Sequence, residues 1–176
     1  ISLKRIEIYD NSHFSGSNML GVMVVSSNLG FEKNQYRKFN LKNNIKVFKS
    51  NDDYGMMEEV FSRRFRKTEK NTSILKLPTP DLILVDGGKG QVKVTCQVLK
   101  NLDIKGVVVI GISKGKERNA GNEKIHFSNI KSYMPHGIKS TNHINPLILD
   151  SNDPVLYFIQ RLRDEAHRFA ITSQRK

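Results

Sequence analysis

The chain has 176 residues, 38% hydrophobic and 26% charged, which fits one folded domain and argues against a disordered segment. Lysine and arginine number 29 against 17 acidic residues, so the net charge of +12 favours a polyanionic partner, nucleic acid before an anionic membrane. The single cysteine, Cys96, excludes an internal disulfide and a CxxC zinc site, and no apolar run approaches the roughly 18 residues of a membrane span.

The first 41 residues predict three strands joined by short turns. Residues 5–10, RIEIYD, alternate between apolar and polar side chains and end on an acid. The chain begins without Met and lacks the apolar core of a signal peptide, so we expect a fragment or mature piece. The single cysteine favours a reducing cytoplasm. Beyond a turn-like segment, residues 19–27 predict a buried strand and residues 31–41 a more exposed one. Such short connections favour an antiparallel meander.

The middle of the chain alternates helical and strand patterns. Spacing and apolar content predict a helix over 53–67, a strand over 81–86, a helix over 89–101 and a strand over 106–112. The stretch 113–146 is rich in Gly, Asn and Lys, and we expect an exposed hairpin or mobile insertion there. Asp153 and Pro154 then predict the start of a long amphipathic helix, with the aspartate as its cap.

This order of elements predicts an α/β, RNase H-like fold in a single domain over residues 1–176. We expect a mixed five-stranded sheet, three antiparallel strands followed by two parallel ones, flanked by helices and with the exposed insertion before the last helix. A doubly wound dinucleotide-binding domain would begin strand–helix–strand and carry GxGxxG after its first strand, and this chain does neither.

Two predicted strands end in an aspartate. Asp10 follows RIEIY and Asp86 follows LILV. If these strands are parallel neighbours, about 4.8 Å apart, the two carboxylates emerge at one sheet edge and can share a divalent cation. The alternative is that each aspartate only caps a loop. For Asp53, helix capping is the simplest interpretation and a metal role the weaker one.

A histidine on the last helix is the third candidate. His167 follows the core-facing Ala166 in RLRDEAHRFA, at the margin of the apolar stripe, from which it can face Asp10 and Asp86. The alternative is a solvent-exposed helix histidine. The remaining histidines are interpreted as loop residues: His13, His126, His136 and His143.

Basic residues near the same edge are candidates for contacts with a phosphate backbone. Lys89 lies in GGKGQ, which lacks the spacing of a P-loop and is also explained as a tight strand-to-helix turn. The others follow the strand 106–112 or lie on the last helix: Lys114, Lys116, Arg163 and Arg168.

Five ordered blocks resemble one family. IEIYDNSHFSG, NDDYGMMEEVFSRRF, DLILVDGGKGQ, IGISKGK and IQRLRDEAHRFAI resemble the C-terminal half of UvrC, the incising protein of the UvrABC excinuclease in bacterial nucleotide excision repair. The resemblance implies an endonuclease that makes the incision 5′ to a DNA lesion, with Asp10, Asp86 and His167 as its catalytic set and Asp53 as a further acidic position. Mg²⁺ or Mn²⁺ held by the catalytic set is then the expected cofactor. The first block departs from the usual DISHTQG but keeps its aspartate.

The resemblance also implies partners. These are DNA and, through the full-length protein, UvrB and UvrA, in the cytoplasm and with no membrane or small-molecule substrate. The GIY-YIG nuclease domain and the helix-hairpin-helix pair of that family are expected to be absent from this fragment. Two alternatives stay open: a non-catalytic RNase H-like module that binds nucleic acid, and a phosphate-binding enzyme that uses GGKGQ on a nucleotide.

Overall fold

The computed structural model describes residues 3–13, 19–41, 53–65, 77–115 and 122–174, without the side chains of Ser12, His13 and Asp53. Its strands are β1 (Ile6–His13), β2 (Met19–Ser27), β3 (Gly30–Phe31), β4 (Arg37–Asn40), β5 (Leu82–Asp86), β6 (Val108–Ser113) and β7 (Lys124–Phe127). Its helices are α1 (Asp53–Arg64), α2 (Lys89–Asn101) and α3 (Pro154–Gln174), with short 3-10 turns η1 (Lys33–Gln35) and η3 (Lys131–Tyr133).

All described strands belong to one mixed sheet in the order β3-β2-β1-β5-β6-β7, with β4 also pairing with β2. β1, β5 and β6 run parallel, whereas β2 pairs with β1 and β7 pairs with β6 in antiparallel fashion. The predicted fold class is confirmed: three antiparallel strands along the chain precede a central parallel unit. The sheet has seven strands rather than five, because η1 divides the predicted strand 31–41 into β3 and β4, and β7 adds an edge.

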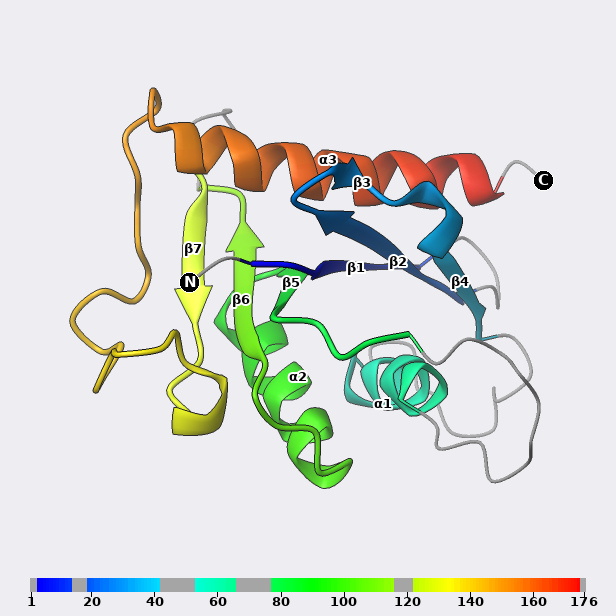
Figure 1. Ribbon diagram of the computed structural model, residues 1–176, viewed down its shortest axis with the longest axis horizontal. Coiled ribbons are helices and arrows are strands. Elements are labelled where there is room, and N and C mark those ends of the chain that lie inside the picture. Colours follow the sequence, from blue (N-terminus) through cyan, green and yellow to red (C-terminus); the bar gives the residue numbers. More distant parts are fainter. Residues whose placement is uncertain (1–2, 14–18, 42–52, 66–76, 116–121, 175–176) are drawn as a thin grey trace.

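Helices cover both faces of this sheet, so the molecule has three layers (Figure 1). Alternate residues of each strand face opposite sides. The face under α3 is aliphatic, and its buried side chains include Ile6, Ile8, Leu82, Leu84, Ile110, Ile112, Ile159, Leu162 and Ala166. The face under α1 and α2 holds Tyr9, Phe61, Ile83, Val85, Val92, Cys96 and Leu99. Burial raises the pKa of the Cys96 thiol to about 11, so this thiol stays protonated at neutral pH.

The long helix α3 begins as its sequence predicts. The backbone N–H of Val155 donates to Asp153 Oδ1 at 2.8 Å, which satisfies a donor of the first turn that the helix itself leaves free. Proline at the first helical position lacks an N–H and sacrifices no helical hydrogen bond there. Figure 1 shows α3 crossing the whole sheet, so its edge passes over the ends of several strands.

The described parts of the stretch 113–146, residues 113–115 and 122–146, belong to the fold more closely than expected. β7 completes the sheet against β6, with Ile125 opposite Ile112, and it includes His126. The loop interpretation is therefore wrong for His126, and it is wrong for His13, the last residue of β1. Tyr133 is 1% exposed and its hydroxyl donates to the carbonyl oxygen of Ile104 at 2.8 Å. The polar composition of the stretch gave no indication that side chains such as Ile125 and Tyr133 are buried. No helix in the described part of the chain is long and apolar enough to cross a membrane.

Candidate active site

The two candidate aspartates occupy matching positions on neighbouring parallel strands. The register pairs Tyr9 of β1 with Val85 of β5, and each aspartate is the next residue. Because Ile8 and Leu84 point to the α3 side, side-chain alternation places Asp10 and Asp86 at equivalent positions relative to that side. The apolar layer under α3 therefore gives way to two carboxylates at this edge of the sheet.

The sequence pattern predicted that Asp10 ends its strand, and this prediction is wrong. β5 stops at Asp86, but β1 continues to His13 because its pairing with β2 extends beyond the pair Asp10 and Val22. Asp10 consequently sits within paired backbone and is only 6% exposed. Because the backbone of Asp10 is paired, its carboxylate has little freedom to move away from Asp86.

The electrostatics of the pair show how closely the two groups interact. Partial burial is the largest cause that raises the pKa of Asp86, and the negative charge of Asp10 is the second. Three cationic groups lower the pKa of Asp86 in part: Arg163, His167 and Lys114. Asp10, Asp86 and His167 therefore share one electrostatic environment. Two of the five predicted DNA contacts, Lys114 and Arg163, belong to the same environment.

His167 reaches this edge from α3. Its Nδ1 lies 3.3 Å from Asp10 Oδ2, and its side chain is 62% exposed while that of Asp10 is 8% exposed. The helix therefore delivers a solvent-accessible imidazole to a buried carboxylate. The contact through Nδ1 orients the ring and leaves its other atoms accessible to solvent or to a bound substrate.

Arg163 lies one helical turn before His167 and contacts a residue that the sequence did not indicate. Its Nη1 is 3.4 Å from Oε1 of Glu123, and its Nη2 is 3.2 Å from Oδ1 of Asp164. Glu123 is 3% exposed and directly precedes β7. The only sequence cue was a carboxylate next to the short alternating segment EKIHF, which by itself does not indicate burial.

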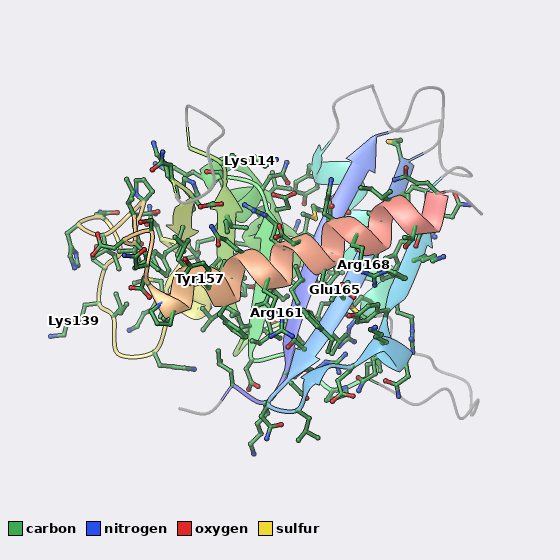
Figure 2. All side chains as sticks on the ribbon, turned by 90° about the horizontal axis from the view of Figure 1, so that it is seen from above. Lys114, Lys139, Tyr157, Arg161, Glu165 and Arg168 are labelled. Atoms are coloured by element: carbon green, nitrogen blue, oxygen red, sulfur yellow. The ribbon has the colours of Figure 1, made fainter. Side chains whose placement is uncertain are left out.

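The remaining predicted positions are dispersed. Arg168 pairs with Glu165 through Nε at 2.7 Å, and Figure 2 shows Arg161 and Glu165 along the side of α3 away from Lys114. Asp53 opens α1 on the opposite face of the sheet, and its side chain is not described. Lys116 lies outside the described residues. Their predicted roles in catalysis or DNA contact stay predictions.

The GGKGQ segment forms the tight turn that its glycines predict. Gly87 has a φ of +152° and donates its N–H to the carbonyl oxygen of Ile112 at 2.8 Å. A Cβ on Gly111 would lie 2.5 Å from the carbonyl oxygen of Gly87, so the backbones of this turn and β6 approach closely. The exposed Lys89 begins α2 immediately afterwards.

The donor set at this edge suits a hard divalent cation. Carboxylate oxygens are preferred ligands of Mg²⁺ and Mn²⁺, and a cation between Asp10 and Asp86 would relieve the repulsion that raises the pKa of Asp86. Within the described ranges, no cluster of three or more His, Cys, Asp or Glu side chains is placed to hold a metal. The fit is therefore to a two-carboxylate site, the kind in which Mg²⁺ keeps water and phosphate as further ligands.

Solved structures give only weak likenesses. The catalytic domain of human Endonuclease V superposes with a TM-score of 0.41 at 18% identity, covering 64% of this chain and 46% of that one. Ciona intestinalis Endonuclease V in complex with an inosine-containing 24mer DNA gives a TM-score of 0.38 at 17% identity, covering 93% and 56%. Neither value is high enough to support an argument about this chain.

Sequence comparison gives a firm result. The family model of the UvrC RNase H endonuclease domain matches residues 1–171. UvrABC system protein C of Cereibacter sphaeroides is 46% identical over 173 residues, and that of Bradyrhizobium diazoefficiens is 44% identical over 180 residues. Each match covers 98% of this chain but only 25% and 24% of the respective relative, so the chain spans about a quarter of their length. The chain belongs to the UvrC RNase H endonuclease domain family.

Proposed function

We propose that this chain is a divalent-metal-dependent endonuclease domain that hydrolyses one phosphodiester bond on the 5′ side of a DNA lesion in bacterial nucleotide excision repair. One observation carries the proposal: Asp10 and Asp86 stand in register on adjacent parallel strands, with His167 of α3 at 3.3 Å from Asp10. Membership of an endonuclease domain family supports the same assignment.

Each residue has a distinct role in this proposal. Asp10 and Asp86 would hold Mg²⁺ or Mn²⁺, which when bound lowers the pKa of a coordinated water and neutralises charge on the scissile phosphate. His167 exchanges a proton with the attacking water or the leaving oxygen, or adds a metal ligand, and its contact with Asp10 fixes the orientation of the ring. Lys114 and Arg163 orient the phosphate, because both cations act on Asp86 and so lie near the reacting group.

The wider biology is part of the same proposal. The chain spans a quarter of its relatives, so incision would occur in a longer UvrC protein, in the cytoplasm and together with UvrB and UvrA. The net charge of +12 suits DNA as the substrate polyanion. Lys89, Lys116 and Arg168 are proposed as outlying contacts with the DNA backbone, and Asp53 as an accessory acidic residue.

The decisive test removes one negative charge at a time without changing side-chain shape. Asp10→Asn and Asp86→Asn are introduced into a full-length UvrC that carries this domain, and 5′ nicking of a lesion-containing duplex is measured with UvrA, UvrB and Mg²⁺ or Mn²⁺. Asp103→Asn is the matched control, because that aspartate is 81% exposed and pairs with the nearby Lys105. We expect both site variants to lose 5′ nicking and the control variant to nick at the wild-type rate. Near-normal nicking by either site variant would favour a non-catalytic nucleic-acid-binding module.

A further inference from the structure

Glu123 is a buried carboxylate for which the proposed mechanism has no use. It is 3% exposed, and burying an ionised carboxylate costs several kcal/mol unless a cation or hydrogen bonds compensate. It pairs with Arg163, whose side chain is 13% exposed. A buried ion pair at the rim of a two-carboxylate site is an unfavourable arrangement if it serves packing alone.

The backbone fixes where this carboxylate stands. The antiparallel register pairs Ser113 of β6 with Lys124 of β7, so the next pair outward is Lys114 and Glu123. One step further, a Cβ on Gly115 would lie 2.4 Å from the backbone oxygen of Asn122, so the segments beyond the two strands also lie close together there. Glu123 is therefore placed by backbone that directly continues the β6–β7 pairing.

Arg163 has three acidic neighbours at this edge. Its guanidinium acts electrostatically on Asp86, contacts Glu123 through Nη1 at 3.4 Å and contacts Asp164 through Nη2 at 3.2 Å. The side chain of Asp164 is 70% exposed and that of Glu123 is 3% exposed, so Glu123 is the buried partner of the guanidinium. Without Glu123, the arginine could turn toward Asp164 or toward Asp86, and a direct pair with Asp86 would occupy a proposed metal ligand. An arginine used on phosphate is most effective when its fork is oriented before substrate arrives.

We propose that Glu123 is a positioning residue, which holds the Arg163 guanidinium beside Asp86 in the orientation that receives the scissile phosphate. The inference rests on the proposed nuclease function and deepens it. Glu123 touches neither metal nor DNA in this role and acts through Arg163. Asp10 and Asp86 would hold the cation, while the anchored arginine would contact the phosphate from the α3 side.

The test is a double-mutant cycle in a full-length UvrC that carries this domain. Glu123→Gln, Arg163→Gln and the double variant are compared for 5′ nicking rate at saturating DNA and metal, for the DNA concentration that gives the half-maximal rate, and for the thermal unfolding midpoint. Glu59→Gln is the matched control, since it removes the acidic half of another glutamate–arginine pair, with Arg63, on the opposite face of the sheet. Glu123→Asp serves as the conservative variant that keeps the charge.

We expect Glu123→Gln to lower the nicking rate by about 10- to 100-fold, the usual cost of losing a group that orients an active-site residue. The half-maximal DNA concentration should stay near the wild-type value, because the contact matters most as charge develops on the phosphate. Glu123→Asp should restore part of the rate. In the Arg163→Gln background, Glu123→Gln should cause no further loss.

Several results would overturn the inference. Equal losses from Glu123→Gln with and without Arg163 would show that Glu123 does not act through the arginine. A loss of rate accompanied by a much lower unfolding midpoint, with no rescue by Glu123→Asp, would show a structural role. If Arg163→Gln nicks normally while Asp10→Asn is inactive, the positioning role fails and the proposed function stands. If Asp10→Asn also nicks normally, the proposed function itself fails.

Discussion

Replacing His167 with alanine should separate catalysis from stability, because this side chain contributes little to the packing of the fold. The side chain is 62% exposed, and its contact with Asp10 is a long one of 3.3 Å. A hydrogen bond contributes about 1 kcal/mol net, and substitutions of exposed residues usually change the free energy of unfolding by about 0.5 kcal/mol or less. We therefore expect His167→Ala to change the free energy of unfolding by less than about 1 kcal/mol.

The expected effect on rate is much larger. A side chain that transfers a proton in the transition state contributes about 10²- to 10⁴-fold to the rate, which is about 2.7 to 5.4 kcal/mol of the activation barrier. The barrier change thus exceeds the stability change several-fold. A solvent-exposed histidine without a catalytic role would show small effects on both quantities.

The assay uses a lesion-containing duplex labelled so that the two cuts give fragments of different length. The family resemblance assigns the 3′ cut to a separate GIY-YIG domain, so in the full-length protein this cut is an internal control for assembly and damage recognition. His143→Ala is the matched control, since His143 is an exposed histidine in a turn between β7 and α3. We expect loss of the 5′ cut alone. Normal 5′ cutting by His167→Ala would refute the assignment, and loss of both cuts would indicate failed assembly instead.

Three further predictions concern charge and packing. Burial and Asp10 raise the pKa of Asp86, so ionisation of Asp86 destabilises the native state as pH rises through that value; Asp86→Asn should raise the unfolding midpoint at pH 7, and a scan toward pH 3 should show the gain disappear. Fluorescence anisotropy should give weak DNA binding by the chain with a steep negative slope of log K against log salt, whereas a flat response would contradict phosphate contacts. Phe61 is 0% exposed and lies 4.7 Å from the Tyr9 ring, so Phe61→Ala should lose about 3–5 kcal/mol in urea unfolding, and a loss under about 1 kcal/mol would contradict its place in the core.

The parts of the fold with strong periodicity were predictable from the sequence. The runs LILVD and VVIGIS can only be buried strands, and the spacing of Ile159, Leu162 and Ala166 fixes the face of α3 that packs on them. Asp10 after RIEIY and Asp86 after LILV were the visible signs of a candidate site. Their adjacency depended on strand order, which the sequence pattern also supported.

The less predictable parts depend on pairing between distant segments. Three aromatic residues between 31 and 41 resemble one continuous strand, yet η1 interrupts it, and the Tyr36 hydroxyl there donates to Glu165 of α3 at 2.9 Å. Glu123 is buried only because β7 pairs with β6, a contact that leaves no periodic pattern in a polar stretch. The pairing of Arg168 with Glu165 was predictable from their three-residue spacing on a helix, and it partly neutralises the charge of that arginine.

Strand β1 carries two buried acids whose surroundings separate a structural role from a functional one. Glu7 is 0% exposed on the α1 side, where Arg64 Nη2 approaches it at 2.6 Å and Arg5 Nε at 2.8 Å. Two permanent cations neutralise one carboxylate and tie β1 to α1, so this cluster is electrostatically complete. A further cation there would meet net positive charge.

Asp10 lies three residues along and differs in the kind of neighbour it has. Its ion pair is with His167, which is charged only when protonated, and its other close electrostatic partner is the like charge of Asp86. Arg163 and Lys114 also act on Asp86, but Arg163 is shared with Glu123 and Asp164, so the two aspartates lack the close pair of arginines that neutralises Glu7. A divalent cation bound by the two aspartates would supply the positive charge that arginines supply to Glu7. The same electrostatic reasoning therefore predicts a stabilising role for Glu7 and supports the proposed cation site at Asp10 and Asp86.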